Sequence, residues 1–209
     1  MFSIIVRRQV LVATLLFCGF GAAYAGSIAL DMTTTTGGFV ISDPSLVQLG
    51  PAANEATLLE DSMFGVTYLS NDPFLGDPGV PVPLTATALT FDYEFSTSGD
   101  DNFSVSLLDP SGGPPLFEWL HDGTAMGPGT FNGDDILIDL VGLGLQGDMI
   151  GIEFLLNANL NDTTLDSVVY FSDVRFSVPD EQIPIGGTVW LFLLGLLPMR
   201  LYFIRDCRS

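Results

Sequence analysis

The chain has 209 residues and a formal net charge of −19, and its 6 basic residues are all arginine. No cluster of basic residues exists between the two ends, which excludes nucleic acid and anionic lipid as partners of a basic patch. His121 is the only histidine, and the only cysteines are Cys18 and Cys207. A zinc site of several histidines, a disulfide within the central region and a cysteine nucleophile there are therefore excluded.

The first 25 residues have the three parts of a secretory signal peptide. Arg7 and Arg8 give a positive start, residues 10–20 are apolar, and Ala23 and Ala25 are small residues at the positions that a signal peptidase reads. The apolar run is short for a membrane span, so we expect cleavage before Gly26 rather than an uncleaved anchor.

Residues 26–178 are expected to form one all-β domain. Residues 89, 91, 93 and 95 are apolar and alternate with polar residues, which predicts a strand with one buried face. About nine or ten such segments are expected, separated by turn sequences. The clearest segments, in chain order, are 27–32, 65–69, 88–95, 103–107, 116–119, 136–140, 149–156 and 168–178.

Many short strands between turns predict a two-sheet antiparallel β-sandwich, jelly-roll-like, with a signal helix before it and a transmembrane helix after it. Residues 96–102 are expected to make a hairpin between the two strands that they join. A weak helical signal covers Glu55 to Glu60.

The turns are rich in carboxylates, and Asp100, Asp101, Asp134 and Asp135 are the candidate metal ligands. Calcium takes six to eight oxygen ligands, which such loops can supply at the rim of a sandwich. The alternative is that aspartate and asparagine simply favour turns. Calcium is thus the one cofactor that the sequence suggests.

Tyr68 and Trp119 are the candidate ligand-binding residues, because flat aromatic rings can stack on sugar rings; the alternative is that both fill the core. No catalytic residue is predicted. Glu118 and His121 have the spacing of a carboxylate metal motif but lie in a strand-rich region, so His121 is expected on the surface or in a loop. Asp92 and Glu94 share a strand face that is expected to be solvated.

The C-terminus divides into a linker at 179–187, an apolar segment at 188–204 and an arginine-containing tail at 205–209. The apolar segment predicts a transmembrane helix, with Arg200 reaching toward the headgroups. Arginines after a span favour the cytoplasmic side, so the domain would face outward.

This tail resembles a PEP-CTERM sorting signal, in which a proline motif, a transmembrane segment and arginines follow one another. The residues that carry the resemblance are Pro179, Pro184, Trp190, Arg200 and Arg205. It implies an exosortase-type processing enzyme as a partner. It also implies export to the membrane, the cell surface or the extracellular matrix of a Gram-negative bacterium, often with exopolysaccharide.

The domain itself weakly resembles the jelly rolls of carbohydrate-binding modules, through residues 88–95, 103–108 and the final Ser172-Asp173-Val174 strand. Together these features predict an exported, non-enzymatic β-sandwich that is associated with the surface or matrix and contacts exopolysaccharide. One alternative is a calcium-dependent, carbohydrate-active hydrolase. Another is a plain tail-anchored acidic surface protein.

Overall fold

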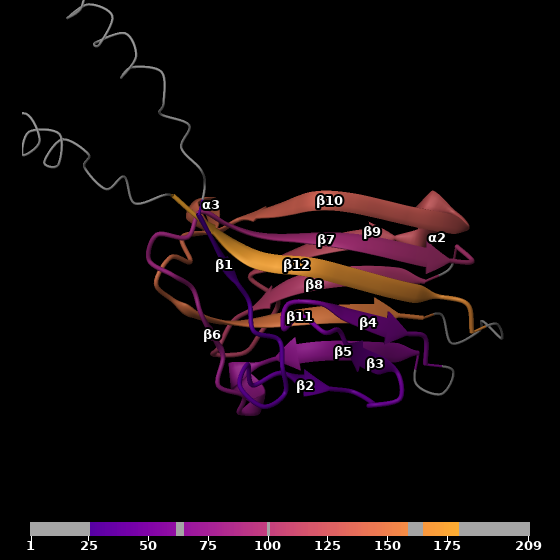
Figure 1. The fold of residues 1–209 in the computed structure, drawn as a ribbon, viewed down its shortest axis with the longest axis horizontal. Coiled ribbons are helices and arrows are strands. Elements are labelled where there is room, and N and C mark those ends of the chain that lie inside the picture. The colour runs from indigo at the N-terminus through magenta and orange to yellow at the C-terminus, as the bar shows by residue number, and fades with distance from the viewer. Residues whose placement is uncertain (1–25, 62–64, 100, 159–164, 180–209) are drawn as a thin grey trace, which may run out of the picture. The chain divides into compact units, whose positions relative to one another are not determined.

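The computed structural model describes residues 26–61, 65–99, 101–158 and 165–179, and Ala25–Pro179 form one compact unit. Its strands form two antiparallel sheets with a shared hydrophobic core, which confirms the prediction of an all-β, two-sheet antiparallel sandwich (Figure 1). The described part of the chain contains twelve strands, more than predicted, because several have only two or three residues.

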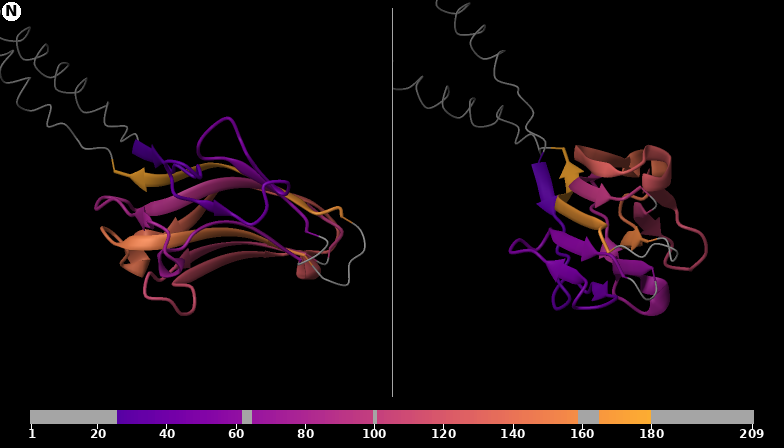
Figure 2. Two further views of the ribbon diagram at one scale, coloured as in Figure 1. Left: turned by 90° about the horizontal axis from the view of Figure 1, so that it is seen from below. Right: turned by 90° about the vertical axis from the view of Figure 1, so that its right-hand side faces the viewer.

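Sheet A has the strand order β10-β7-β12-β4-β3, and β1 pairs with the second half of β12. Sheet B has the order β2-β5-β11-β8-β9, and β6 pairs with the start of β11. Figure 2 shows the two layers from two further directions. The strands of sheet A are β1 (Gly26–Ala29), β3 (Val47–Leu49), β4 (Ala56–Leu59), β7 (Ala88–Thr97), β10 (Gly129–Asp139) and β12 (Val168–Val178). The strands of sheet B are β2 (Val40–Ile41), β5 (Val66–Asn71), β6 (Val80–Pro81), β8 (Asn102–Leu108), β9 (Phe117–Asp122) and β11 (Met149–Asn157).

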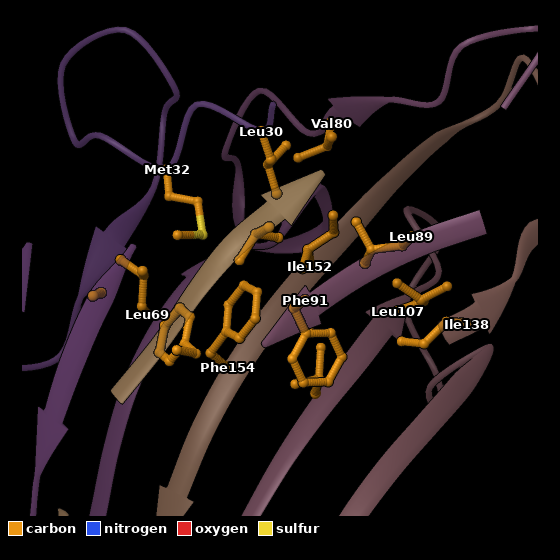
Figure 3. Close-up of a cluster of buried hydrophobic side chains, with 14 of the residues drawn as sticks. Leu30, Met32, Leu69, Val80, Leu89, Phe91, Leu107, Ile138, Ile152 and Phe154 are labelled. Atoms are coloured by element: carbon orange, nitrogen blue, oxygen red, sulfur yellow. The ribbon is translucent and has the colours of Figure 1, made fainter. Parts of the chain in front are cut away.

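The core lies between the sheets and is rich in phenylalanine. The rings of Phe154 on β11 and Phe171 on β12 stack with centroids 4.2 Å apart and planes 5° apart, so one ring from each sheet meets at the centre. Phe91 meets Phe154 edge-on at 6.4 Å. Figure 3 shows Phe91 and Phe154 among the aliphatic side chains. The predicted inward face of β7 is confirmed, since Leu89, Phe91, Tyr93 and Phe95 are all buried.

Two β-bulges change which residues of a strand point inward. In β12, Val169 and Phe171 are buried before the bulge and Val174 and Phe176 after it, a shift of one residue. Asp173 takes up this shift with a φ of 52°, a left-handed conformation that aspartate adopts more readily than most residues. β10 has an equivalent bulge, where Asp135 also has a φ of 52°. Each bulge keeps both halves of a long strand facing the core.

The prediction of a hairpin at residues 96–102 is wrong. β7 pairs with β10 and β12 in sheet A, whereas β8 pairs with β9 and β11 in sheet B. The connection therefore crosses from one sheet to the other. Both strands have an inward face, and alternation alone does not tell whether two such faces lie in one sheet or oppose each other.

The weak helical signal at Glu55 to Glu60 is also wrong, because Ala56–Leu59 form β4 between β3 and β12. The described helices are short: η1 (Pro73–Leu75), α2 (Gly123–Met126) and α3 (Leu140–Leu143). Among the described residues, no helix is long and apolar enough to cross a membrane. The predicted signal at 1–25 and the predicted segments from 180 onward lie outside the described residues.

Candidate functional site

Two rows of residues cross the face of sheet B that points away from the core. Residues paired across neighbouring strands share a face, so the register places these side chains together. The first row is Tyr68, Leu155, Ser104 and Leu120, and the second is Ser70, Glu153, Ser106 and Glu118, read from β5 through β11 and β8 to β9. We call these eight residues the sheet B outer face. It joins small hydroxyl side chains to two carboxylates and one aromatic ring.

Glu153 is the central charged group of this face. Its side chain is half-buried between Ser70 and Ser106, its partners on the adjacent strands. Burial raises the pKa of Glu153 above its ordinary value, the Ser70 hydroxyl partly opposes this, and the charges of Asp72 and Glu118 raise it further. The carboxyl group is thus partly dehydrated and surrounded by hydroxyls, which suits hydrogen bonding to the hydroxyls of a ligand.

Tyr68 stands in the row beside Glu153 and is half-buried. Its backbone N–H donates to Ser42 Oγ at 3.1 Å, which ties β5 to the segment after β2. Across the strands it is paired with Leu155. The structure therefore places this predicted ligand residue on the outer surface of a sheet, next to the serine and glutamate side chains.

Trp119, the other predicted ligand residue, lies on the opposite face of sheet B. Its half-buried ring packs against the core, with centroid distances of 5.3 Å to Phe91 and 5.0 Å to Tyr93. The alternation of β9 turns Trp119 and His121 inward while Glu118 and Leu120 face out. A role of Trp119 in ligand binding stays a prediction. In the structure its ring packs against the core from β9, the edge strand of sheet B.

His121 is buried within β9, so the expectation of a surface or loop histidine is wrong. Its Nδ1 lies 3.1 Å from the Tyr93 hydroxyl, and its ring centroid is 4.7 Å from that of Phe131. Burial lowers the pKa of His121 below its ordinary value of 6.5, although the nearby charge of Asp122 opposes the shift. The ring is thus a neutral member of an aromatic group that closes the edge between β9 and β10.

The predicted metal ligands are not one group. Asp134 and Asp135 form the bulge of β10, where the Asp135 N–H donates to Asp92 Oδ1 at 2.7 Å. Arg175 Nη2 pairs with Asp135 Oδ1 at 2.6 Å and the same guanidinium pairs with Asp173. Arginine thus already neutralises the carboxylate of Asp135. Asp100 lies outside the described residues.

Asp101 instead meets two carboxylates that were not among the predicted ligands. Glu60, Asp101 and Asp166 each offer one ligand oxygen, and these three oxygens lie within 4.8 Å of one another. Glu60 and Asp101 are buried. Glu60 Oε2 accepts the Asp166 and Ser167 N–H groups at 2.9 and 3.0 Å. The Ser167 hydroxyl donates to Asp101. Oxygen donors of this kind fit Ca²⁺, with further ligands from backbone carbonyls and water.

Sequence reasoning did not bring Glu60 and Asp166 together, because they are 106 residues apart. The pairing of Val168 with Leu59 brings the end of β4 beside the start of β12, and Glu60 N–H donates to Ser167 O at 3.1 Å. Only this long-range register makes the cluster. Of the predicted sorting residues, Pro179 is exposed just beyond β12, and Pro184, Trp190, Arg200 and Arg205 lie outside the described residues.

Comparison with known proteins gives weak structural likenesses. The chain matches no protein-family model and no curated protein. One similar structure is TmCBM61 in complex with beta-1,4-galactotriose, at 12% identity and a TM-score of 0.35, covering 66% of this chain and 88% of the other. Another is Caldicellulosiruptor saccharolyticus CBM27-1 in complex with mannohexaose, at 12% identity and a TM-score of 0.40, covering 74% and 98%. A third is infectious bursal disease virus Gx strain, at 10% identity and a TM-score of 0.30, covering 78% of this chain and 32% of the other.

Proposed function

We propose that the protein is a non-catalytic, carbohydrate-binding β-sandwich that is exported and held at the cell surface or in the extracellular matrix. The observation that carries the proposal is the sheet B outer face, where a dehydrated Glu153 lies among serine hydroxyls beside Tyr68. A carboxylate can accept two sugar hydroxyls, and a tyrosine ring can cover the apolar face of a pyranose. The ligand class is a neutral polysaccharide, because the acidic chain repels anionic polymers.

The test is binding of the purified protein to a panel of neutral polysaccharides, including the exopolysaccharide of the host. Glu153→Gln and Tyr68→Ala are each expected to weaken saturable binding about tenfold or more, the loss of one good hydrogen bond or stacking contact. Glu94→Gln and Tyr170→Ala on the outer side of sheet A are the matched controls and should bind as the parent does. Equal affinity in all four variants would contradict the proposal.

A second candidate is glycoside hydrolysis, because Glu153 and Glu118 stand two strands apart on one face. Strands lie about 4.8 Å apart, which separates the two backbones by roughly 9.6 Å, near the carboxyl spacing of inverting enzymes. The raised pKa of Glu153 is the property that a general acid needs. Turnover of a bound polysaccharide that disappears in Glu153→Gln would establish hydrolysis, and binding without turnover would leave the binding module.

The route to the surface is part of the proposal and rests on the sequence of the two ends. Signal cleavage before Gly26, membrane insertion of residues 188–204 and processing by an exosortase-type enzyme would together deliver the sandwich. Intact mass of the protein from membranes and from the medium tests each step. Loss of residues 1–25 and of the segment from about 179 onward supports processing. Loss of the first segment alone supports a tail-anchored protein.

A further inference from the structure

Among the described residues, more of the exposed large apolar side chains lie at one end of the sandwich than at the other. The described loops at this end join β5 to β6, β6 to β7, β8 to β9 and β10 to β11. They and the neighbouring β1 carry Ile28, Phe74, Leu75, Leu84, Leu116, Val141, Leu143 and Met149, all exposed. We call these eight residues the apolar end. At the opposite end, the described loops carry only Met126 and Leu165 as exposed large apolar residues.

Contacts hold several loops of the apolar end against one another. Phe74 packs over Gly112, Met149 and Pro73 both adjoin Gly79, and Leu84 packs over Gly147. Gly147 N–H donates to Val82 O at 3.1 Å, which holds the Leu84 loop beside the start of β11. Hydrogen bonds within the loops hold two of these side chains in place. Asp72 Oδ1 accepts the Phe74 N–H at 2.9 Å, and Asp139 Oδ1 accepts the Val141 N–H at 3.0 Å.

A pocket of about 290 Å³ opens at the same end and is lined mainly by apolar side chains. Ile28, Val80, Pro81 and Phe176 contribute to its wall, and the Asp31 carboxylate is its one charged group. Phe74, Leu75 and Leu84, which are 62%, 77% and 80% exposed, belong to loops of the same end but are not part of the wall of the pocket. Patches of this kind on a protein surface mark sites of contact with proteins or membranes.

The chain itself indicates which partner covers this end. Gly26 and Val178 are paired, so the described chain begins and ends side by side here (Figure 1). It continues into residues 180–209, which include the uncharged, mostly apolar residues 188–199. We propose that the apolar end docks on a phospholipid surface, with Phe74, Leu75 and Leu84 inserted among the headgroups. The carboxylates of these loops favour zwitterionic over anionic lipid, because they repel negative headgroups. These carboxylates belong to Asp72, Asp77, Asp109, Asp139 and Asp148.

The test uses the full chain with Cys18→Ser and Cys207→Ser, reconstituted in phosphatidylcholine vesicles. A single cysteine carrying the fluorophore NBD replaces Phe74 or Leu84 at the apolar end, or Met126 or Leu165 at the opposite end. Phe74 and Met126 are matched controls, since they are 62% and 61% exposed. Nitroxide-labelled phosphatidylcholine then reports which positions lie at the lipid.

At Phe74→Cys and Leu84→Cys we expect NBD emission to shift to the blue on the vesicles, and nitroxide-labelled lipid to quench most of it. We expect neither effect at Met126→Cys or Leu165→Cys. Equal quenching at both ends would overturn the proposal, as would no quenching at the apolar end or protein that does not float with the vesicles. A blue shift that grows with protein concentration but resists nitroxide lipid would identify a second copy as the partner and would also overturn it. Because this readout needs no glycan, its result is independent of the polysaccharide-binding test.

Discussion

His121 should make the stability of the domain depend on pH near neutrality. The ring is buried, its Nε2 has no hydrogen-bond partner among the described residues, and burial lowers its pKa below 6.5. Phe131 and Phe95 face it with ring centroids at 4.7 and 5.4 Å, so a proton added at Nε2 would meet aromatic surface. Asp122 is the nearby charge that opposes the shift.

The sign follows from proton linkage. The folded state holds His121 neutral, whereas the unfolded chain takes up a proton at its ordinary pKa of 6.5. The contribution of His121 to the free energy of unfolding is therefore fully present above about pH 6.5. It is lost as the pH falls from 6.5 toward the lower pKa that His121 has in the folded state. At pH 5.5, RT ln(1 + 10) gives a loss of about 1.4 kcal/mol relative to pH 8, an upper bound reached when the folded state takes up no proton.

The assay is urea unfolding of the parent, His121→Phe and His121→Gln at about pH 8 and pH 5.5. Both variants lose stability at each pH, because Tyr93 loses its imidazole partner, so the quantity compared is the change between the two pH values. The carboxylates other than Asp122, whose pKa His121 lowers, titrate alike in all three proteins and cancel. We expect the parent to lose more stability than either variant, by up to about 1.4 kcal/mol. Equal losses in all three would refute the inference that folded His121 is neutral.

Two further predictions concern the buried carboxylates and the core. Ca²⁺ should raise the Tm of the parent and of Glu94→Gln but not of Glu60→Gln, because Glu60 belongs to the three-carboxylate cluster and Glu94 does not. At a free Ca²⁺ concentration of about 100 Kd, the free energy of unfolding should rise by about 2.7 kcal/mol. EDTA should reverse the gain, whereas an equal gain in Glu60→Gln would indicate general screening of the net charge. Phe154→Ala should cost about 3–5 kcal/mol in chemical unfolding, because its ring stacks on Phe171 at 4.2 Å, and a loss below about 1 kcal/mol would show that the core refills the space.

Local alternation predicts the longer strands but not β2, β3, β4 and β6. The inward face of β7 follows from strict alternation. The bulges at Asp135 and Asp173 were not predicted, because a one-residue shift looks in sequence like the end of one pattern and the start of another. The sequence gives no sign of which strands pair, which is why the crossing from β7 to β8 was taken for a hairpin.

The candidate site shows the same limit more sharply. Tyr68 stands out in the sequence because the chain has only 5 tyrosines and 2 tryptophans. Glu153 was not, because one glutamate among 25 acidic residues has no local mark. Its distinguishing property is the company of Ser70 and Ser106 on the adjacent strands, which exists only once β5, β11 and β8 are in register. Function on a sheet face depends on cross-strand neighbours, and these are the contacts that sequence reasoning cannot reach.

The two proposed surfaces are compatible because they occupy different sides of the sandwich. The apolar end is formed by loops at one end of the strands, whereas the sheet B outer face runs along their length. If both proposals hold, the Tyr68 row of that sheet face is the part farther from the membrane, whereas Glu153 lies close enough to the loops of the apolar end for the Asp72 charge to raise its pKa. Dehydrating the loop carboxylates costs free energy, which would limit how deeply the loops insert. On this proposal charge and apolar surface act together: the apolar side chains would bring the domain to the bilayer, and the acidic surface would keep the rest of it in solvent.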